Sequence, residues 1–201
     1  MSIKGRTKGI LFIISGPSGS GKTTLAESLL EIKALGDKLV KSRSLTTRPK
    51  RSGERNKKDY FFISAADFKR RLEAKKVLEW TRYLGYYYGT PQGFIDRQIG
   101  EGKHVVLCLD LKGAALLKRL YPANSVTIFV LPPSLKELRR RIRQRCRKAT
   151  PAEINQRLML AKKELLLAHK YDHCVVNKNF TGALKRLRQI VLRIIRQKGG
   201  R

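Results

Sequence analysis

The sequence has no long hydrophobic run and few cysteines, and both absences exclude classes of protein. No apolar stretch approaches the eighteen or so residues of a membrane span. The first nine residues, "MSIKGRTKG", contain no small-residue cleavage site typical of a signal peptide. We therefore expect a cytoplasmic protein that does not span a membrane.

The three cysteines, Cys108, Cys146 and Cys174, are odd in number, widely spaced and outside any Cys-x-x-Cys pair. This pattern excludes a disulfide framework and a structural zinc site. His169 and His173 lie beside Cys174, but no carboxylate or cysteine cluster stands nearby to complete a set of ligands. We therefore expect no metal site built from cysteine and histidine.

Acidic residues are also scarce, since 45 Lys and Arg face 15 Asp and Glu, for a formal net charge of +30. Such a charge attracts polyanions of every kind, including nucleotides, nucleic acids and anionic membranes. Charge alone does not choose among them, and part of it belongs to solvated basic faces. With 201 residues and 41% hydrophobic content, the chain can form one main domain with a real core.

Apolar runs and amphipathic segments alternate along the chain. Strand-like runs at 10–14, 104–109, 125–131 and 173–177 are each followed by a segment with helical periodicity. This alternation predicts an α/β sandwich with a parallel sheet. Helices are expected to begin near Lys22, Lys112, Ser134 and Thr181, the last capped by Asn179 or Thr181, with another over Pro151–Lys170.

Two segments break the alternation. Residues 42–90 are rich in Arg, Tyr, Ser, Thr and Gly, with short strand-like pieces around one helical stretch, "AADFKRRLEAKKV". This composition predicts a small inserted subdomain. Residues 139–157 join two helical segments at an arginine-lined break.

A phosphate-binding loop follows the first strand-like run. Gly16, Gly21, Lys22 and Thr23 complete the pattern G-x-x-x-x-G-K-[ST]. The glycines let backbone N–H groups curl around phosphate oxygens, and the following helix places its positive N-terminus there. The lysine supplies a mobile positive charge, and the threonine hydroxyl can bind Mg²⁺. Because a strand precedes the pattern and an amphipathic helix follows it, we predict a nucleotide site, of the kind that GTPases, ATPases and small-molecule kinases share.

The stretches "SRSLTTRPKRSGERNKKDYFFIS" and "LEWTRYLGYYYGTP" identify the second substrate, because they resemble the guanylate kinase family closely. The resemblance extends from Gly16 to Asn177 with the motifs in order. It implies a P-loop NTPase fold, a three-layer α/β sandwich with a parallel sheet, in one domain over 1–201. It also implies a GMP-binding subdomain at 42–90, a helical lid at 139–158, and a core formed by 8–41, 91–138 and 159–199.

The resemblance further implies the roles of individual residues. The ATP-binding set is Gly16, Pro17, Ser18, Gly19, Ser20, Gly21, Lys22, Thr23, Thr24 and Asn177, with Thr23 at the metal. The GMP-binding set is Ser44, Arg48, Arg51, Tyr60, Glu79, Tyr88, Thr90 and Asp110. The catalytic set is Lys22, Arg48, Arg141, Arg145 and Arg157. The implied reaction is reversible transfer of the ATP γ-phosphate to GMP, with dGMP also expected as an acceptor and Mg²⁺ as the cofactor.

The chemistry of these residues supports the same assignment. Guanine presents donors at N1 and N2 and acceptors at O6 and N7, so a carboxylate and hydroxyls can recognise it. Glu79 with Ser44 and Thr90 would supply that set, whereas adenine would leave the carboxylate facing an acceptor. The attacking phosphate of GMP is already largely ionised at neutral pH, so no strong general base is needed. Transfer then requires placement and positive charge.

Four positions depart from the family pattern. Cys108 stands where the family usually has an acidic residue two positions before Asp110, so we expect either that Asp110 acts with less help or that the Mg²⁺ shell differs. Lys57 and Cys146 replace usual glycines, and Lys112 replaces a common glutamine.

Three other functions stay open from the sequence. One is a catalytically weak guanylate-kinase-like binding module, although the chain keeps Lys22 and the lid arginines. Another is a P-loop kinase for a different small acceptor. The third is nonspecific nucleic-acid binding driven by the +30 charge. The chain is expected to be a monomer or weak dimer.

Overall fold

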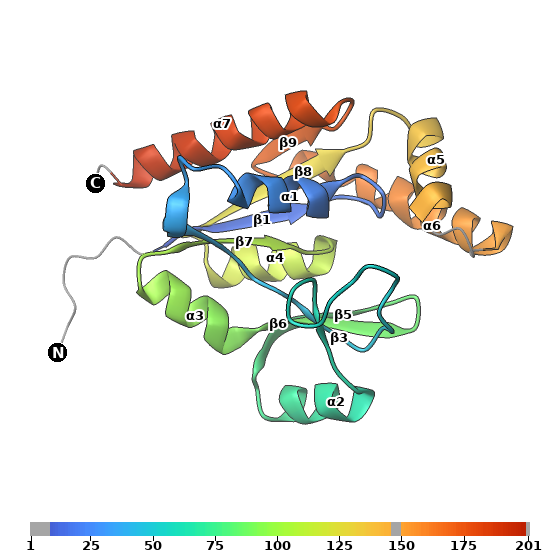
Figure 1. The fold of residues 1–201 in the computed structure, drawn as a ribbon, viewed down its shortest axis with the longest axis horizontal. Coiled ribbons are helices and arrows are strands. Elements are labelled where there is room, and N and C mark those ends of the chain that lie inside the picture. Colours follow the sequence, from blue (N-terminus) through green and yellow to red (C-terminus); the bar gives the residue numbers. More distant parts are fainter. Residues whose placement is uncertain (1–8, 146–149, 200–201) are drawn as a thin grey trace.

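The computed structural model describes residues 9–145 and 150–199, and its centre is a five-stranded parallel sheet (Figure 1). The strands lie in the order β2-β7-β1-β8-β9. Their bounds are β1 Leu11–Ser15, β2 Leu39–Lys41, β7 His104–Cys108, β8 Ser125–Leu131 and β9 His173–Val176. The predicted parallel α/β architecture is therefore confirmed.

Helices cover both faces of this sheet (Figure 1). The helices α1 (Lys22–Leu30) and α7 (Phe180–Gly199) lie on one face, and α3 (Gln92–Gly100) and α4 (Leu111–Leu120) lie on the other. Side chains of β1 alternate between the two layers, because successive residues of a strand point to opposite faces. Phe12 and Ile14 pack with α1 and α7, while Leu11 and Ile13 pack with α3 and α4.

A second sheet lies between β2 and α3 in the sequence. Its order is β4-β3-β6-β5, formed by β3 (Leu45–Thr46), β4 (Phe61–Phe62), β5 (Val77–Tyr83) and β6 (Tyr86–Pro91). The helix α2 (Ala65–Glu73) packs against it through Phe68, which stacks on Tyr87 with ring centroids 5.3 Å apart. We call this unit the second sheet.

The helices α5 (Leu135–Arg145) and α6 (Pro151–Leu165) project beyond the carboxyl edge of the central sheet (Figure 1). They pack on each other through a small apolar cluster that includes Leu138, Ile142 and Ile154. Thr150 begins α6 with a capping box, its hydroxyl accepting the N–H of Glu153. Cys146 lies outside the described residues.

Several elements differ from the sequence-based expectations. The helix expected over 151–170 ends at Leu165, and a separate 3₁₀ turn, Ala168–Lys170, follows. The helical stretch expected over 65–77 ends at Glu73, because residues 76 and 77 join the second sheet. The strands β2, β3 and β5 and the helix α3 were not predicted. Asn179, rather than Thr181, caps α7 by accepting the N–H of Gly182 at 2.7 Å.

Among the helices of the described ranges, none is long and apolar enough to cross a membrane.

Candidate active site

The phosphate-binding loop connects β1 to α1, and its backbone is shaped by glycines at positive φ. Gly21 has φ 90°, and a Cβ atom there would lie 2.3 Å from Nδ2 of Asn177. That amide donates to the carbonyl of Ser20 at 2.8 Å, so the segment after β9 braces the loop. Asn177, expected on the adenine side, is buried and acts on the loop backbone.

One cavity lies at the carboxyl edge of the central sheet, between the phosphate loop, the second sheet and α6. Twelve residues of the sequence-predicted sets line it: Gly16, Ser18, Lys22, Thr23, Ser44, Arg48, Arg51, Tyr60, Glu79, Tyr88, Asp110 and Arg157. Residues distant in the sequence therefore meet in one place, with the lysine of the phosphate loop and the residues predicted to bind GMP lining the same cavity.

An adjoining cavity is lined by the rest of the phosphate loop and by Arg141. Its walls include Gly19, Gly21, Lys22, Thr23 and Thr24. The two cavities share Lys22, Thr23 and Tyr60. A donor and an acceptor nucleotide could thus lie end to end with their phosphates at the shared residues.

Glu79 lies at the base of the first cavity, on β5, and is only 5% exposed. The hydroxyl of Thr90 donates to its Oε1 at 2.5 Å. Gly113 makes room for the carboxylate, because a Cβ atom at that position would lie 2.6 Å from Oε2. Burial, and secondarily the nearby charge of Asp110, raises the pKa of Glu79 to about 7, although the Thr90 hydrogen bond works in the opposite direction.

Thr90 is fully buried, and its hydroxyl is committed to Glu79. From the sequence alone we expect this hydroxyl to face guanine directly. In the structure the Thr90 hydroxyl lies behind Glu79 and orients its carboxylate. Of the two hydroxyl residues expected to read guanine, only Ser44 is among the residues that line the cavity.

Arg48 and Arg51 line the cavity from the loop that follows β3. Arg48 is 9% exposed, and its guanidinium lies over the rings of Tyr60 and Phe62, at 5.6 Å from each centroid. Its Nη2 also donates to Glu54. Such cation–π contacts and ion pairing hold a guanidinium in one place.

The helical arms bring further cations to the site. Arg141, on α5, donates to Glu137 at 2.8 Å and to the carbonyl of Asn177 at 3.1 Å. Arg157, on α6, lines the cavity, and its buried Nε has no hydrogen-bond partner among the residues described. The side chain of Arg145, the third predicted lid arginine, lies outside the described part of the structure.

The cavity is also lined by residues that the sequence did not predict. Thr81 and Tyr83 lie on the same face of β5 as Glu79, because alternate residues of a strand share a face. Glu164 lies seven residues after Arg157 on α6, a spacing that places both on one helix face. Burial raises the pKa of Glu164, while the charge of Lys22 lowers it. Two sequence patterns could have identified these residues: the alternation in "EWTRY", which places Thr81 and Tyr83 with Glu79, and the seven-residue spacing between Arg157 and Glu164.

The oxygen atoms at the phosphate end fit a hard cation. The hydroxyl residue Thr23 and the carboxylate residue Asp110 line one cavity with Lys22, and Mg²⁺ prefers such oxygen ligands. Cys108 lines the same cavity as a partly buried thiol, and desolvation raises its pKa, so it is not a thiolate at neutral pH. Within residues 9–145 and 150–199 no group of three His, Cys, Asp or Glu side chains could hold a metal ion by itself.

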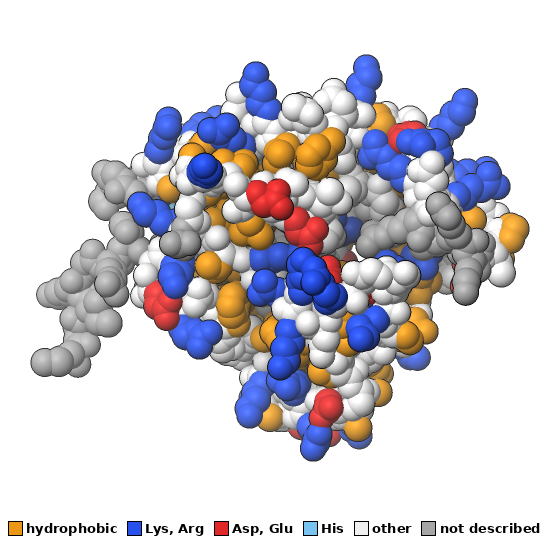
Figure 2. Space-filling view, viewed as in Figure 1, with side chains coloured by type: hydrophobic (Ala, Val, Ile, Leu, Met, Phe, Trp, Pro, Cys, Tyr) orange, Lys and Arg blue, Asp and Glu red, His pale blue; other side chains and the backbone are white. Residues whose placement is uncertain are grey.

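The surface around the site is basic. In Figure 2, Lys and Arg side chains are spread over the whole visible face, and acidic side chains are few. The excess of basic side chains attracts anionic ligands to this face, although a few acidic side chains lie near its centre.

Comparisons with known proteins agree with this geometry. A family model described as guanylate kinase matches residues 8–193. The chain is 45% identical over 184 residues to a guanylate kinase of Thermotoga maritima, covering 92% of this chain and 86% of that protein. It is 42% identical over 192 residues to a guanylate kinase of Caldanaerobacter subterraneus, with 96% and 90% covered.

A solved structure is also similar. The crystal structure of guanylate kinase from Anaplasma phagocytophilum matches with a TM-score of 0.76 and 30% sequence identity. The match covers 92% of this chain and 85% of that one.

Proposed function

The chain belongs to the guanylate kinase family, and from that membership we infer that it is an ATP:GMP phosphotransferase, which transfers the γ-phosphate of ATP to GMP. One observation supports the assignment of the site: a single cavity joins the lysine of an ATP loop to a buried carboxylate suited to guanine. We propose the residue roles that follow.

At the acceptor end, ionised Glu79 accepts hydrogen bonds from N1–H and N2–H of guanine, and Ser44 contacts the acceptor edge. Thr90 acts through Glu79. Asp110 lines the same cavity as both Glu79 and Thr23, and we assign its carboxylate to GMP binding. Arg48, Arg51, Tyr60 and Tyr88 bind the phosphate, because bidentate cations and phenols are suited to a monophosphate.

At the transfer end, Lys22, Arg141, Arg145 and Arg157 stabilise the charge that develops on the moving phosphoryl group. The phosphate of GMP is the nucleophile and needs no base. Closure of α5 and α6 over both nucleotides would exclude water from the γ-phosphate. Thr23 would hold Mg²⁺, which when bound with ATP neutralises phosphate charge.

The direct test is release of ADP with ATP and Mg²⁺ against GMP, dGMP, AMP, CMP and UMP at fixed moderate salt. We expect turnover with GMP and dGMP alone. Turnover with another base would keep the kinase assignment and refute the role of Glu79. Nucleotide binding without turnover would instead favour a binding module.

The role of Lys22 has its own test. Replacement by methionine should lower kcat by about 100- to 1,000-fold, because a charge that stabilises the transition state is lost. Circular dichroism should show an unchanged fold. Turnover close to wild type in a folded Lys22→Met protein would contradict this role.

Four expectations stay predictions from the sequence. They are the use of dGMP as an acceptor, a monomeric or weakly dimeric state, nonspecific binding to polyanions and a cytoplasmic location.

A further inference from the structure

We propose that Glu54 is a positioning residue for the acceptor phosphate, which holds Arg48 and Arg51 in their binding geometry. The proposal rests on the proposed function, in which these two arginines bind the phosphate of GMP. Glu54 also lines the adjoining cavity, and the proposed role of its carboxylate is to act on the acceptor phosphate through the two arginines.

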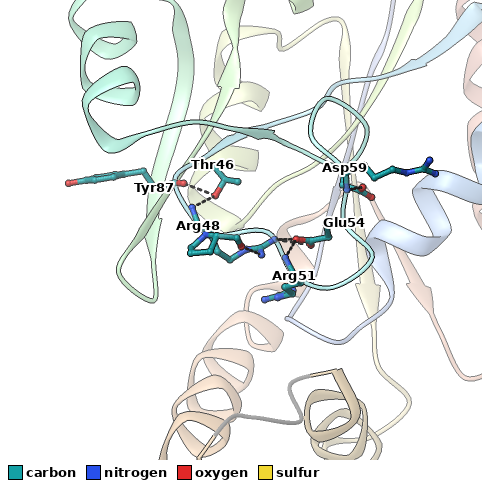
Figure 3. Close-up of polar contacts among 8 residues, drawn as sticks. Thr46, Arg48, Arg51, Glu54, Asp59 and Tyr87 are labelled. Atoms are coloured by element: carbon teal, nitrogen blue, oxygen red, sulfur yellow. Dashed lines mark hydrogen bonds and ion pairs between the residues drawn. The ribbon is translucent and has the colours of Figure 1, made fainter.

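The carboxylate of Glu54 contacts both arginines (Figure 3). Nη2 of Arg48 donates to Oε1 at 2.8 Å and to Oε2 at 2.9 Å. The backbone N–H of Arg51 donates to the same Oε2 at 2.8 Å. One carboxylate therefore binds the side chain of the first arginine and the backbone of the second.

The turn between Arg51 and Glu54 is closed in both directions. The N–H of Glu54 donates to the carbonyl of Arg51 at 3.1 Å, and the N–H of Arg51 donates back to the Glu54 side chain. This reciprocal pairing fixes the backbone that carries Arg51. Loss of the carboxylate would leave only one of the two bonds.

Arg48 makes further hydrogen bonds through its guanidinium and its backbone, and together with the bond to Glu54 they form what we call the frame of Arg48. Nη1 donates to the carbonyl of Pro49 at 2.6 Å. Its backbone N–H donates to the hydroxyl of Thr46 at 3.2 Å, and that hydroxyl donates to the carbonyl of Tyr87 at 3.0 Å (Figure 3). The frame connects the arginine to two strands of the second sheet.

The pairing is largely shielded from solvent, because the side chains of Arg48 and Glu54 are 9% and 16% exposed. Burial works to raise the pKa of Glu54, but hydrogen bonds from Arg48 and from the Arg51 N–H outweigh it and keep the pKa below its usual value. Glu54 is thus a carboxylate throughout the neutral range. A surface pair would contribute little, but a shielded, hydrogen-bonded pair defines geometry.

Charge and position make opposite predictions for the variant Glu54→Gln. If Glu54 only neutralised the loop, its removal would increase the positive potential and tighten GMP binding. If it positions the arginines, the same change loosens them and weakens GMP binding. Glu54→Asp keeps the charge but shortens the reach, so only the positioning role predicts weaker binding in both variants.

The experiment measures GMP and guanosine binding by calorimetry, and KM for GMP and ATP by ADP release, in the wild type and the variants. We expect Glu54→Gln to weaken GMP binding about tenfold, as for loss of one charge-assisted hydrogen bond, with a smaller loss in Glu54→Asp. Guanosine, which has no phosphate, should bind all proteins equally, and KM for ATP should stay within twofold.

Glu73→Gln is the matched control. It makes the same chemical change in the same part of the chain, on α2, where the side chain is 65% exposed. It should leave every measured value unchanged.

The outcomes separate this proposal from the proposed function. A wild-type protein without GMP binding would refute the proposed function. A wild type that binds GMP, with equal or tighter binding in Glu54→Gln or wild-type binding in Glu54→Asp, would overturn the positioning role. Equal weakening of GMP and guanosine would also overturn it, since general damage to the second sheet would explain the loss.

Discussion

At the scale of single residues, Glu79 shows how a fold alters the chemistry of a side chain. The sequence identifies it as a carboxylate suited to guanine, but its ordinary pKa would leave it ionised at all working pH values. Burial raises that pKa to about 7. The protonation state of the residue proposed to recognise guanine therefore changes within the physiological range.

This shift predicts pH-dependent guanine binding. Above pH 7 Glu79 is ionised and accepts from N1–H and N2–H, whereas below pH 7 it is protonated and binding weakens by about tenfold per pH unit. Calorimetry with guanosine between pH 5.5 and 8 isolates the effect, because guanosine lacks the phosphate group that titrates near pH 6. Glu79→Gln should bind weakly with a flat profile, and a flat wild-type profile would refute the shift.

The same shift has a consequence for stability. The folded-state pKa is above the unfolded value, so the folded protein binds more protons than the unfolded chain between them. The burial of ionised Glu79 therefore lowers the free energy of unfolding by its whole amount above pH 7, and this loss of stability decreases as the pH falls toward 4.5.

Lys57 is strained by its backbone. It has φ 63°, in the left-handed region that favours glycine, and its N–H donates to the carbonyl of Tyr60 at 2.8 Å. Lys57→Gly should raise the free energy of unfolding by up to about 1 kcal/mol, as measured by urea denaturation. Lys58→Gly, beside it but outside the left-handed region, should give no gain. A loss of stability in Lys57→Gly would contradict the strain.

At the scale of elements, most strands and helices of the central layer were predictable from the sequence, because they carry their own periodicity, and the exceptions are β2 and α3. The three-residue strand β2 and the glycine-containing helix α3 carry too weak a local signal. The end of α2 depends on partners. The N–H of Gln92 donates to the carbonyl of Lys76 at 3.1 Å. This hydrogen bond leads the chain into β5 at a point where the sequence alone still has a helical pattern.

A contact between elements gives the next prediction. Asn177, which follows β9, holds the phosphate loop through the Ser20 carbonyl. Asn177→Ala should raise KM for ATP about tenfold, because a buried loop carbonyl loses its partner, and should leave KM for GMP unchanged. Steady-state kinetics with each substrate varied will measure this split. Asn155→Ala, at an exposed position of α6, is the control, and an unchanged KM for ATP in Asn177→Ala would contradict the bracing role.

At the scale of the whole molecule, the +30 charge predicts salt-dependent binding to polyanions. Affinity for a short DNA duplex should fall by about 1,000-fold or more between 50 and 200 mM salt, because binding releases counterions. Fluorescence anisotropy across this range measures the slope. An affinity that does not change with salt would contradict this prediction and would indicate a specific interface with DNA.

The sequence by itself determined the fold class and the phosphate-binding loop, because periodicity and motif spacing are local properties of the chain. The role of Glu79 in reading guanine stays a prediction from the family resemblance. The tertiary structure alone decided that Thr90 lies behind Glu79, that Asn177 braces the phosphate loop and that Glu54 holds Arg48. It also decided the pKa of Glu79. Burial and hydrogen-bond partners depend on residues distant in sequence, so no local pattern encodes them.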